Sequence, residues 1–399
     1  MLENKKFKRI FLLIIDSLGV GFDDYAKKFG DENSDTLGHI TETCPDINIP
    51  NLKSLGLFNL DKTDICQKYS VDKPKSYCMR LREKSNAKST MEGHFEMMGV
   101  YTEVPFLTFT DTGFPDDLLK EIERISGRQV IGNIAASGTE IIKELALEEI
   151  NNNKIIVYTS ADSVLQVCGH EESFDLKELY RVCEAIREIT MKPEWKVGRV
   201  IARPYAGTNP DNFTRTSNRR DYAIAPSIDT ALNILQNNKY DVIGVGKIGD
   251  IFSMQGINES LHSDSSVHGM EQTIDLLKNR DFNGFCFVNL VDFDAKWGHR
   301  RNPNGYAKEL EMFDIKLKEF LEYMNDDDLL MISADHGNDP TFRGTDHTRE
   351  YVPLIIYSTL YDNPRELKMQ DSFAIIGNMI LENFGLEPNA DMIQNKIEV

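Results

Sequence analysis

Four short apolar runs are the feature of this sequence that most limits its fold. They are residues 10–15, 285–291, 329–332 and 352–357. Each is almost uninterrupted and ends in a polar loop, and helical-looking stretches such as 306–324 separate them. Runs of this kind are typical of strands buried on both faces of a mostly parallel sheet. We therefore expect an α/β core with helices flanking the sheet.

Acidic residues follow three of these runs. Asp16 follows the first, Asp294 comes just after the second, and Asp335 follows the third and is joined by His336. In parallel sheets, ligands bind beyond the carboxyl ends of the strands, where side chains from distant segments meet. Carboxylate and imidazole groups together suit a divalent metal ion. The sequence therefore predicts a metal-dependent site at this edge of the sheet.

The candidate metal ligands are Asp16, Asp294, His299, Asp335, His336 and His347, and the candidate nucleophile is Thr90. A hydroxyl is a weak nucleophile at neutral pH, and coordination to a metal lowers its pKa and positions it. Two divalent ions can hold the attacking and leaving oxygens of a phosphoryl transfer. Taken singly, Asp16 could cap a turn, His299 could be a satisfied loop residue and Thr90 an ordinary surface threonine. Their combination favours two-metal phosphoryl transfer.

The segment 104–222 has a pattern of its own. Its expected strands are 129–131, 154–159 and 199–201, and its expected helices are 115–125, 137–145 and 176–189. None of the candidate metal ligands lies in it. We therefore expect a smaller α+β domain, 104–222, inserted into a discontinuous metal-binding core, 1–103 and 223–399.

The composition narrows the range of partners. The net charge of −19 argues against duplex nucleic acid and anionic membrane surfaces, since both need a basic face. No apolar run reaches the ~18 residues of a membrane-spanning helix. The six cysteines are scattered without a CxxC pair, which indicates reduced thiols and a cytoplasmic location. A small anionic substrate and a monomeric state are both compatible with the sequence.

Seven stretches carry a resemblance that spans nearly the whole chain, insert included. They are 15–21 (IDSLGVG), 34–39 (SDTLGH), 159–162 (TSAD), 198–205 (GRVIARPY), 212–222 (NFTRTSNRRDY), 289–294 (NLVDFD) with 298–301 (GHRR), and 334–341 (ADHGNDPT). In these stretches the chain resembles the phosphopentomutases of the alkaline phosphatase superfamily. The resemblance implies an alkaline-phosphatase-like core, with a mostly parallel sheet flanked by helices, and an inserted cap domain for substrate binding.

The resemblance also implies a role for each site residue. Thr90 matches the threonine that is phosphorylated in the active enzyme. One metal is implied for Asp16, Asp335 and His336, and a second for Asp294, His299 and His347. The family generally uses manganese, so two Mn²⁺ ions are implied. The residues that match sugar-phosphate contacts are Ser160, Asp162, Arg199, Ile201 and Arg215 in the insert and Lys247 in the core.

The implied enzyme is an isomerase of nucleoside catabolism that acts on small pentose phosphates. It interconverts α-D-ribose 1-phosphate and D-ribose 5-phosphate, and the 2-deoxyribose pair. Phospho-Thr90 donates its phosphoryl group to the free hydroxyl, and the resulting 1,5-bisphosphate returns the other phosphoryl group. Glucose 1,6-bisphosphate, or a similar sugar bisphosphate, is the implied activator. Closure of the cap would exclude water, which would otherwise hydrolyse the phosphothreonine.

The chain departs from the family pattern beside the nucleophile. Ser89 and Glu92 stand where the family usually has aspartate and threonine. The alternatives that stay open are a metal-dependent sugar-phosphate phosphatase or phosphodiesterase of the same superfamily, a mutase for another sugar phosphate, and a homologue without catalytic activity.

Overall fold

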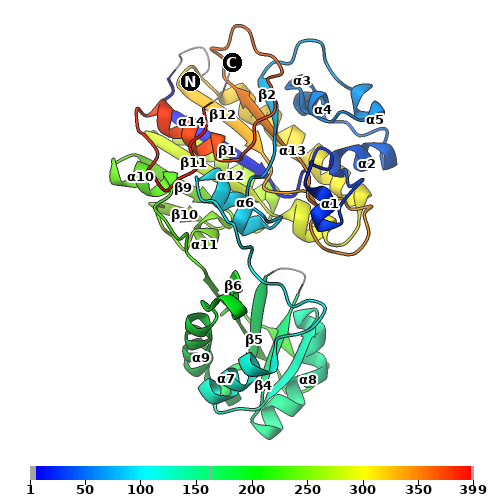
Figure 1. Cartoon of the computed structure of the whole chain (residues 1–399), viewed down its shortest axis with the longest axis vertical. Coiled ribbons are helices and arrows are strands. Elements are labelled where there is room, and N and C mark those ends of the chain that lie inside the picture. The colour runs from blue at the N-terminus through cyan, green and yellow to red at the C-terminus, as the bar shows by residue number, and fades with distance from the viewer. Residues whose placement is uncertain (1–5, 161–162, 397–399) are drawn as a thin grey trace. The chain divides into compact units, whose positions relative to one another are not determined.

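The computed structural model describes residues 6–160 and 163–396. Its contacts divide the chain into two compact units (Figure 1). The core consists of Met1–Pro105 with Ala225–Val399, and the insert is Phe106–Ile224, where the sequence predicts 104–222. None of the described helices is both long and apolar enough to cross a membrane. All six cysteines are free thiols.

The core is built on a seven-stranded sheet. In spatial order the strands are β10 (Glu259–Leu261), β9 (Asp241–Val245), β11 (Gly284–Leu290), β1 (Arg9–Ile15), β12 (Asp328–Ser333), β13 (Val352–Tyr357) and β2 (Tyr77–Leu81). Neighbours from β10 to β12 run parallel, which confirms the expected mostly parallel sheet. The run 352–357 is an exception, since β13 is antiparallel to both β12 and β2. The reason is that no crossover helix joins β12 to β13, and the chain returns through a loop.

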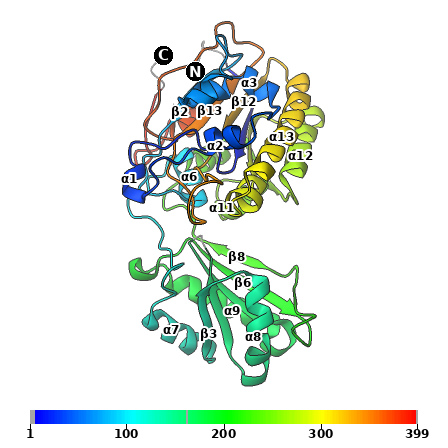
Figure 2. The ribbon, with the colours of Figure 1, turned by 90° about the vertical axis from the view of Figure 1, so that its right-hand side faces the viewer.

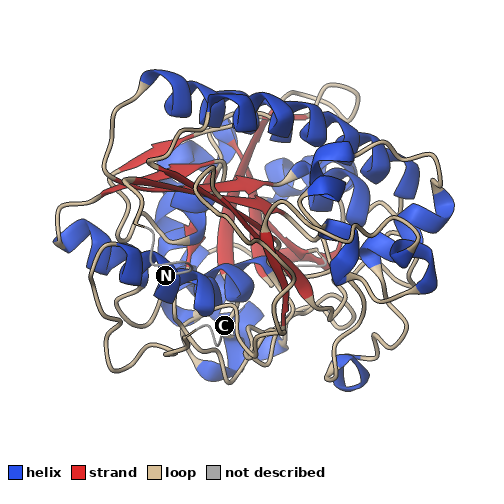
Figure 3. Ribbon diagram, turned by 90° about the horizontal axis from the view of Figure 1, so that it is seen from above, coloured by secondary structure: helices blue, strands red, loops and turns tan. Residues whose placement is uncertain are grey.

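Helices lie on both sides of this sheet (Figure 3). α12 (Ser266–Asn279) packs against α13 (Pro303–Tyr323) and β11, and α14 (Ile375–Asn383) packs against α10 (Ala231–Asn237). α13 begins three residues before the expected start because the Asn302 side chain caps it, accepting a hydrogen bond from the Gly305 N–H at 2.9 Å. The other described core helices are α1 (Ala26–Phe29), α2 (Thr36–Thr43), α3 (Pro50–Ser54), α4 (Leu57–Leu60), α5 (Asp64–Gln67), α6 (Thr90–Met97), α11 (Ile248–Ile251) and a π-helical turn, Phe293–Gly298.

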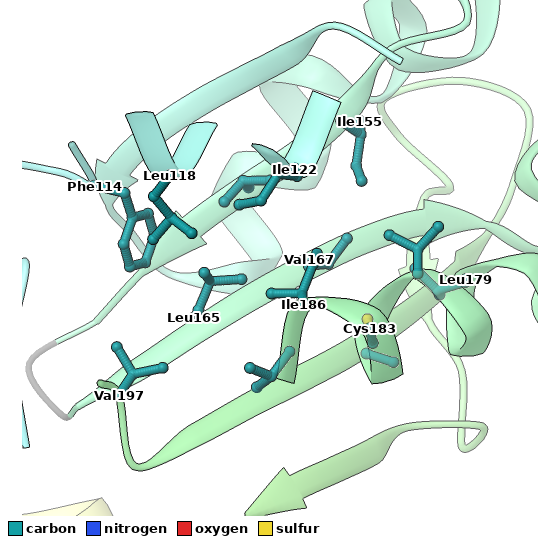
Figure 4. Close-up of a cluster of buried hydrophobic side chains, with 14 of the residues drawn as sticks. Phe114, Leu118, Ile122, Ile155, Leu165, Val167, Leu179, Cys183, Ile186 and Val197 are labelled. Carbon is teal, nitrogen blue, oxygen red and sulfur yellow. The ribbon is translucent and has the colours of Figure 1, made fainter. Parts of the chain in front are cut away.

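The insert contains its own six-stranded sheet with helices on both faces. The strands are β3 (Val130–Ala135), β4 (Ile155–Thr159), β5 (Val164–His170), β6 (Arg199–Ala206) and β7 (Thr214–Arg215) in spatial order, with β8 (Arg220–Ala223) also paired to β6. α7 (Asp116–Ser126) and α9 (Leu176–Ile189) cover one face, burying side chains such as Leu118, Val167 and Ile186 (Figure 4). α8 (Gly138–Asn152) packs on the other face (Figure 2). Tyr158 and Tyr205 belong to the apolar cluster that it covers.

The predicted helices and strands of the insert are present, with shifted ends. α8 continues to Asn152 instead of ending at 145, because Leu145 and Ile150 extend the apolar face that packs on the sheet. It stops at Asn153, whose φ of 54° is left-handed. The sequence analysis missed β5, β7 and β8.

Candidate metal centre and nucleophile

The sheet register brings the three acidic residues together. Ile14 on β1 lies opposite Ser333 on β12, so Asp16 and Asp335, each two residues further on, leave the same edge side by side. β11 flanks β1 on its other side and leads into the π-helical turn that carries Asp294. All three side chains are buried. This arrangement is what parallel neighbouring strands predict.

Each of these carboxylates has one oxygen held by the protein. The Asn289 amide donates to Asp16 Oδ2 at 2.8 Å, and the Ser17 N–H donates to Asp335 Oδ1 at 3.0 Å. In the described part of the chain, Asp16 Oδ1 and Asp335 Oδ2 are buried without a well-formed hydrogen bond, and the only nearby donor to Asp335 Oδ2 is His94 Nδ1 at 3.2 Å, which is shared with the Thr90 carbonyl. A buried oxygen that no cation or donor reaches lowers the stability of the folded protein by about 1–3 kcal/mol, and by more when it is charged. The bare oxygens therefore fit ligand positions for a cation.

Distances within the first group fit a single ion. His336 Nε2 lies 3.5 Å from Asp16 Oδ1 and 3.5 Å from Asp335 Oδ2. Ligands bound at ~2.0–2.2 Å around one ion are separated by about 3.0–3.6 Å. Asp16, Asp335 and His336 also form one of two buried groups whose ligand atoms lie within 4.8 Å of one another. The first predicted trio is therefore assembled in the structure.

The second group lies beside the first. Asp294 Oδ2 is 3.0 Å from His299 Nε2 and 3.6 Å from His347 Nε2, and the two imidazole nitrogens are 3.1 Å apart. The ligand atom of His336 also lies within 4.8 Å of the ligand atoms of Asp294 and His347. The His336 ring stacks on the His347 ring, with 3.8 Å between the ring centroids. The two trios are thus adjacent, as a two-metal site requires.

The histidine protonation pattern favours metal binding. Nδ1 of His299, His336 and His347 lies 2.7, 3.0 and 2.9 Å from the backbone oxygens of Thr345, Gly337 and Lys88, respectively. A carbonyl oxygen only accepts, so each Nδ1 carries the proton and each Nε2 keeps a lone pair. Two lone pairs that face each other at 3.1 Å repel unless a cation lies between them. The donor set therefore fits two divalent ions.

The charges of the site lead to the same conclusion. Burial raises the pKa of Asp16 well above its usual range, and the charges of Asp335 and Asp294 raise it further, whereas the Asn289 hydrogen bond and the positive charge of Lys247 lower it. Divalent cations would relieve the repulsion among the three carboxylates.

Thr90 is the first residue of α6 and faces the first trio. Its Oγ1 lies 3.1 Å from His336 Nε2, to which the hydroxyl donates because Nδ1 holds the ring proton. Gly93, one helical turn after Thr90, allows α6 to approach the backbone at the end of β12. A Cβ on residue 93 would lie 2.9 Å from the Asp335 carbonyl carbon and closer still to the carbonyl oxygen. The position of the hydroxyl is therefore set by a close helix–backbone contact.

Three supporting residues escaped the sequence analysis. His94 lies with Nδ1 2.8 Å from the Thr90 carbonyl and 3.2 Å from Asp335 Oδ2, so it braces both groups. Asn289 holds Asp16, and the Asn338 amide donates to Asp294 Oδ1 at 2.6 Å. A polar Asn inside the apolar run 285–291 was the available signal for Asn289. The departures from the family pattern pair with each other, because the Ser89 hydroxyl donates to Glu92 Oε2.

The insert holds the remaining predicted residues, apart from Lys247. Arg199 and Ile201 share one face of β6, and Arg199 lies 4.0 Å from Asp221. Arg215 is exposed on β7, opposite Tyr205, and the Ser160 carbonyl accepts a hydrogen bond from Thr110. Asp162 lies outside the described residues. Lys247 precedes α11 in the core, within electrostatic reach of Asp16.

Comparison with known proteins identifies the family. A family model described as the Metalloenzyme superfamily matches residues 8–388. The phosphopentomutase of Clostridium beijerinckii is 57% identical over 383 residues, covering 96% of this chain and 96% of the relative. That of Clostridium tetani is 55% identical over 395 residues, covering 98% of each. The chain belongs to the phosphopentomutase family.

Membership of the phosphopentomutase family confirms the resemblance seen in the seven sequence stretches. The solved structure of a Leishmania mexicana phosphoglycerate mutase at low cobalt concentration covers 98% of each chain with a TM-score of 0.50 and 11% identity. At this identity the likeness shows a common fold alone. The phosphopentomutase-family chain thus has the alkaline-phosphatase-like α/β fold that the sequence predicts.

Proposed function

We propose that this enzyme interconverts α-D-ribose 1-phosphate and D-ribose 5-phosphate, and the 2-deoxyribose pair. Its relatives named phosphopentomutase are mutases, an isomerase class, and the similarity covers almost the whole chain. The observation that carries the proposal is the Thr90 hydroxyl beside two adjacent metal-ligating trios. A two-metal site with a built-in hydroxyl suits transfer of a phosphoryl group to and from the protein.

We assign the trio of Asp16, Asp335 and His336 to one metal and that of Asp294, His299 and His347 to the other, with Mn²⁺ as the proposed ion. When bound, the metals would lower the pKa of the threonine hydroxyl and neutralise charge on the phosphoryl oxygens. The protein contributes the orientation. His336 accepts the hydrogen bond from Thr90, and three backbone carbonyls fix the imidazole rings.

The proposed cycle has two balanced transfers. In the first, the bond between phosphorus and Thr90 Oγ1 breaks, a bond from phosphorus to the free sugar oxygen forms, and the sugar hydroxyl proton passes to the released Thr90 Oγ1. The product is the 1,5-bisphosphate. In the second, the bond between the other phosphorus and its sugar oxygen breaks, a bond to Thr90 Oγ1 forms, and the Thr90 proton passes to the released sugar oxygen. A sugar bisphosphate such as glucose 1,6-bisphosphate supplies the first phosphoryl group.

We assign sugar-phosphate binding to Ser160, Asp162, Arg199, Ile201 and Arg215 of the insert and Lys247 of the core. Guanidinium and ammonium groups give charge-assisted hydrogen bonds to a phosphate that does not react. The backbone of Ile201 and the side chains of Ser160 and Asp162 suit the sugar hydroxyls. A cytoplasmic location and a role in nucleoside catabolism complete the proposal.

The test follows two products at once. Manganese-loaded protein, primed with glucose 1,6-bisphosphate, is incubated with ribose 1-phosphate while ribose 5-phosphate and free phosphate are measured. We expect ribose 5-phosphate without equivalent phosphate release, and no turnover by Thr90→Val. Thr43→Val, an exposed threonine at the end of α2, is the matched control and should retain activity. Release of phosphate in place of isomerisation would identify a phosphatase instead.

A further inference from the structure

The insert contains a cavity of about 460 Å³ with three arginines in its lining. All of its lining residues belong to the insert, and they come from α8, β6 and the segment 213–219. Its lining residues are Thr139, Ile142, Arg203, Pro204, Phe213, Thr214, Arg215, Thr216 and Arg219. Cavities of ~300–1,000 Å³ are of the size that holds small ligands.

Strand pairing places two of the arginines on one face. Arg215 on β7 lies opposite Tyr205 on β6, and directly opposed residues project to the same side. Arg203 precedes Tyr205 by two residues, so it projects to that side as well. Tyr205 belongs to the apolar cluster under α8. The arginines therefore converge beside this helix and not on the opposite face, which α7 and α9 cover.

Arg203 is a partly buried cation whose nearest acidic influence is Asp221, which is itself paired with Arg219. Its Nε donates to Gln166 Oε1 at 2.8 Å, and the same oxygen accepts from the Tyr158 hydroxyl at 3.1 Å. Among the described residues no carboxylate bonds to it. Burial lowers the pKa of Arg203, and the nearby charges of Arg219 and Arg215 lower it further, which outweighs the opposing effects of Tyr158 and Asp221. An anion in the cavity would offset both effects.

The local charge remains positive after its acids are counted. Arg219 pairs with Asp221, and Glu171 accepts a hydrogen bond from Thr216, but neither carboxylate lines the cavity. Three guanidinium groups line the cavity, and in the part of the chain that the structure describes only two carboxylates lie near enough to offset their positive charge. Planar guanidinium groups match the oxygens of phosphate better than an ammonium does.

The start of α8 adds donors on the same side. Ser137 precedes the helix but its side chain makes no capping hydrogen bond. Thr139, in the first turn, lines the cavity, and a Cβ at Gly138 would lie 3.6 Å from Arg215 Nη1. The first N–H groups of a helix carry a partial positive charge and attract anions. The first N–H groups of α8 and the arginines therefore lie beside the same cavity.

We propose that this cavity binds the dianion of a phosphate monoester or of inorganic phosphate, with Arg203 and Arg219 as binding residues beyond those assigned above. Arg215 would serve both sets. Where the ligand is a pentose phosphate, the inference rests on the proposed function and gives its non-reacting phosphate a defined site on the insert. Where the ligand is inorganic phosphate, the cavity is a separate regulatory site.

The test measures binding to the full chain by calorimetry, with inorganic phosphate and with ribose 5-phosphate as probes. It is done with manganese and again after EDTA treatment, because the cavity needs no metal. We expect binding to persist in EDTA and to weaken about 10- to 100-fold in Arg203→Gln and in Arg219→Gln. Arg203→Lys keeps the charge and checks that the site has not collapsed. Arg124→Gln, which removes an exposed arginine paired with Glu121 on α7, is the matched control.

The outcomes are separable. Unchanged affinity in both glutamine variants, or no binding to the EDTA-treated chain, overturns the proposal. Tighter binding of ribose 5-phosphate than of phosphate identifies the substrate as the source of the dianion, and equal binding identifies free phosphate. Failure of the mutase assay in wild-type protein that still binds phosphate through Arg203 would refute the proposed function and leave this site standing.

Discussion

Substitution of Gly93 by alanine tests how Thr90 is positioned. The added Cβ would lie 2.9 Å from the Asp335 carbonyl carbon, whereas carbon atoms in contact are ~3.5–4.0 Å apart. The Asp335 carbonyl oxygen would be nearer still, so the start of α6 and the strand end must separate by about 1 Å or more. Alanine favours a helix over glycine by about 1 kcal/mol, and overpacking against a backbone costs about 1–3 kcal/mol. We expect a net loss of up to about 2 kcal/mol in the free energy of unfolding.

The loss of activity should be larger than the loss of stability. A displacement of about 1 Å in a catalytic group can cost on the order of 100-fold in rate, so kcat for ribose 1-phosphate should fall by about that factor. Gly269→Ala is the matched control, because its Cβ would meet side-chain atoms alone, the Leu290 Cδ2 methyl at 3.2 Å and the Ser263 Oγ and Cβ at 3.6 and 3.7 Å. Urea unfolding and steady-state kinetics measure both effects. Wild-type kcat in Gly93→Ala would refute the reasoning.

Three further substitutions test other parts of the account. Arg349→Met leaves the buried carboxylates of Asp23 and Glu83 unpaired and should cost about 3–5 kcal/mol in urea unfolding, and an unchanged midpoint would contradict this. Burial, and then the charge of Asp339, raises the pKa of Glu350 to about 8, so the folded state holds a proton that the unfolded state loses above pH ~4.5. Stability should therefore fall by about 1 kcal/mol per pH unit between pH 6 and 8, and Glu350→Gln should flatten that slope. His299→Ala should lower the bound manganese, measured by mass spectrometry, from two equivalents to one, and retention of both would remove it from the ligand set.

Much of the catalytic edge could be predicted from the sequence. Asp16 and Asp335 directly follow apolar strands, and neighbouring parallel strands place their ends together. The pairing of β13 could not be predicted this way. An apolar run does not state its direction, which depends on whether a helix or a loop precedes it.

The finer geometry of the site was beyond sequence reasoning. The position of Thr90 depends on the contact between Gly93 and a backbone carbonyl distant in the chain. The lone pairs of the histidines are oriented by carbonyls such as Lys88 O, which carry no sequence signal. His94 was left without a defined role for the same reason. From the sequence alone, Arg203 would be taken for an ordinary surface residue, because only the strand pairing shows that it shares a face with Arg215.

Peptide mass spectrometry of the primed enzyme tests the central claim most directly. Protein incubated with manganese and glucose 1,6-bisphosphate is quenched and digested, and phosphorylated residues are located. We expect phosphate on Thr90, none in the Thr90→Val variant, and an unphosphorylated neighbouring Ser89. Full mutase turnover with phosphate on another residue, or by Thr90→Val itself, would contradict it.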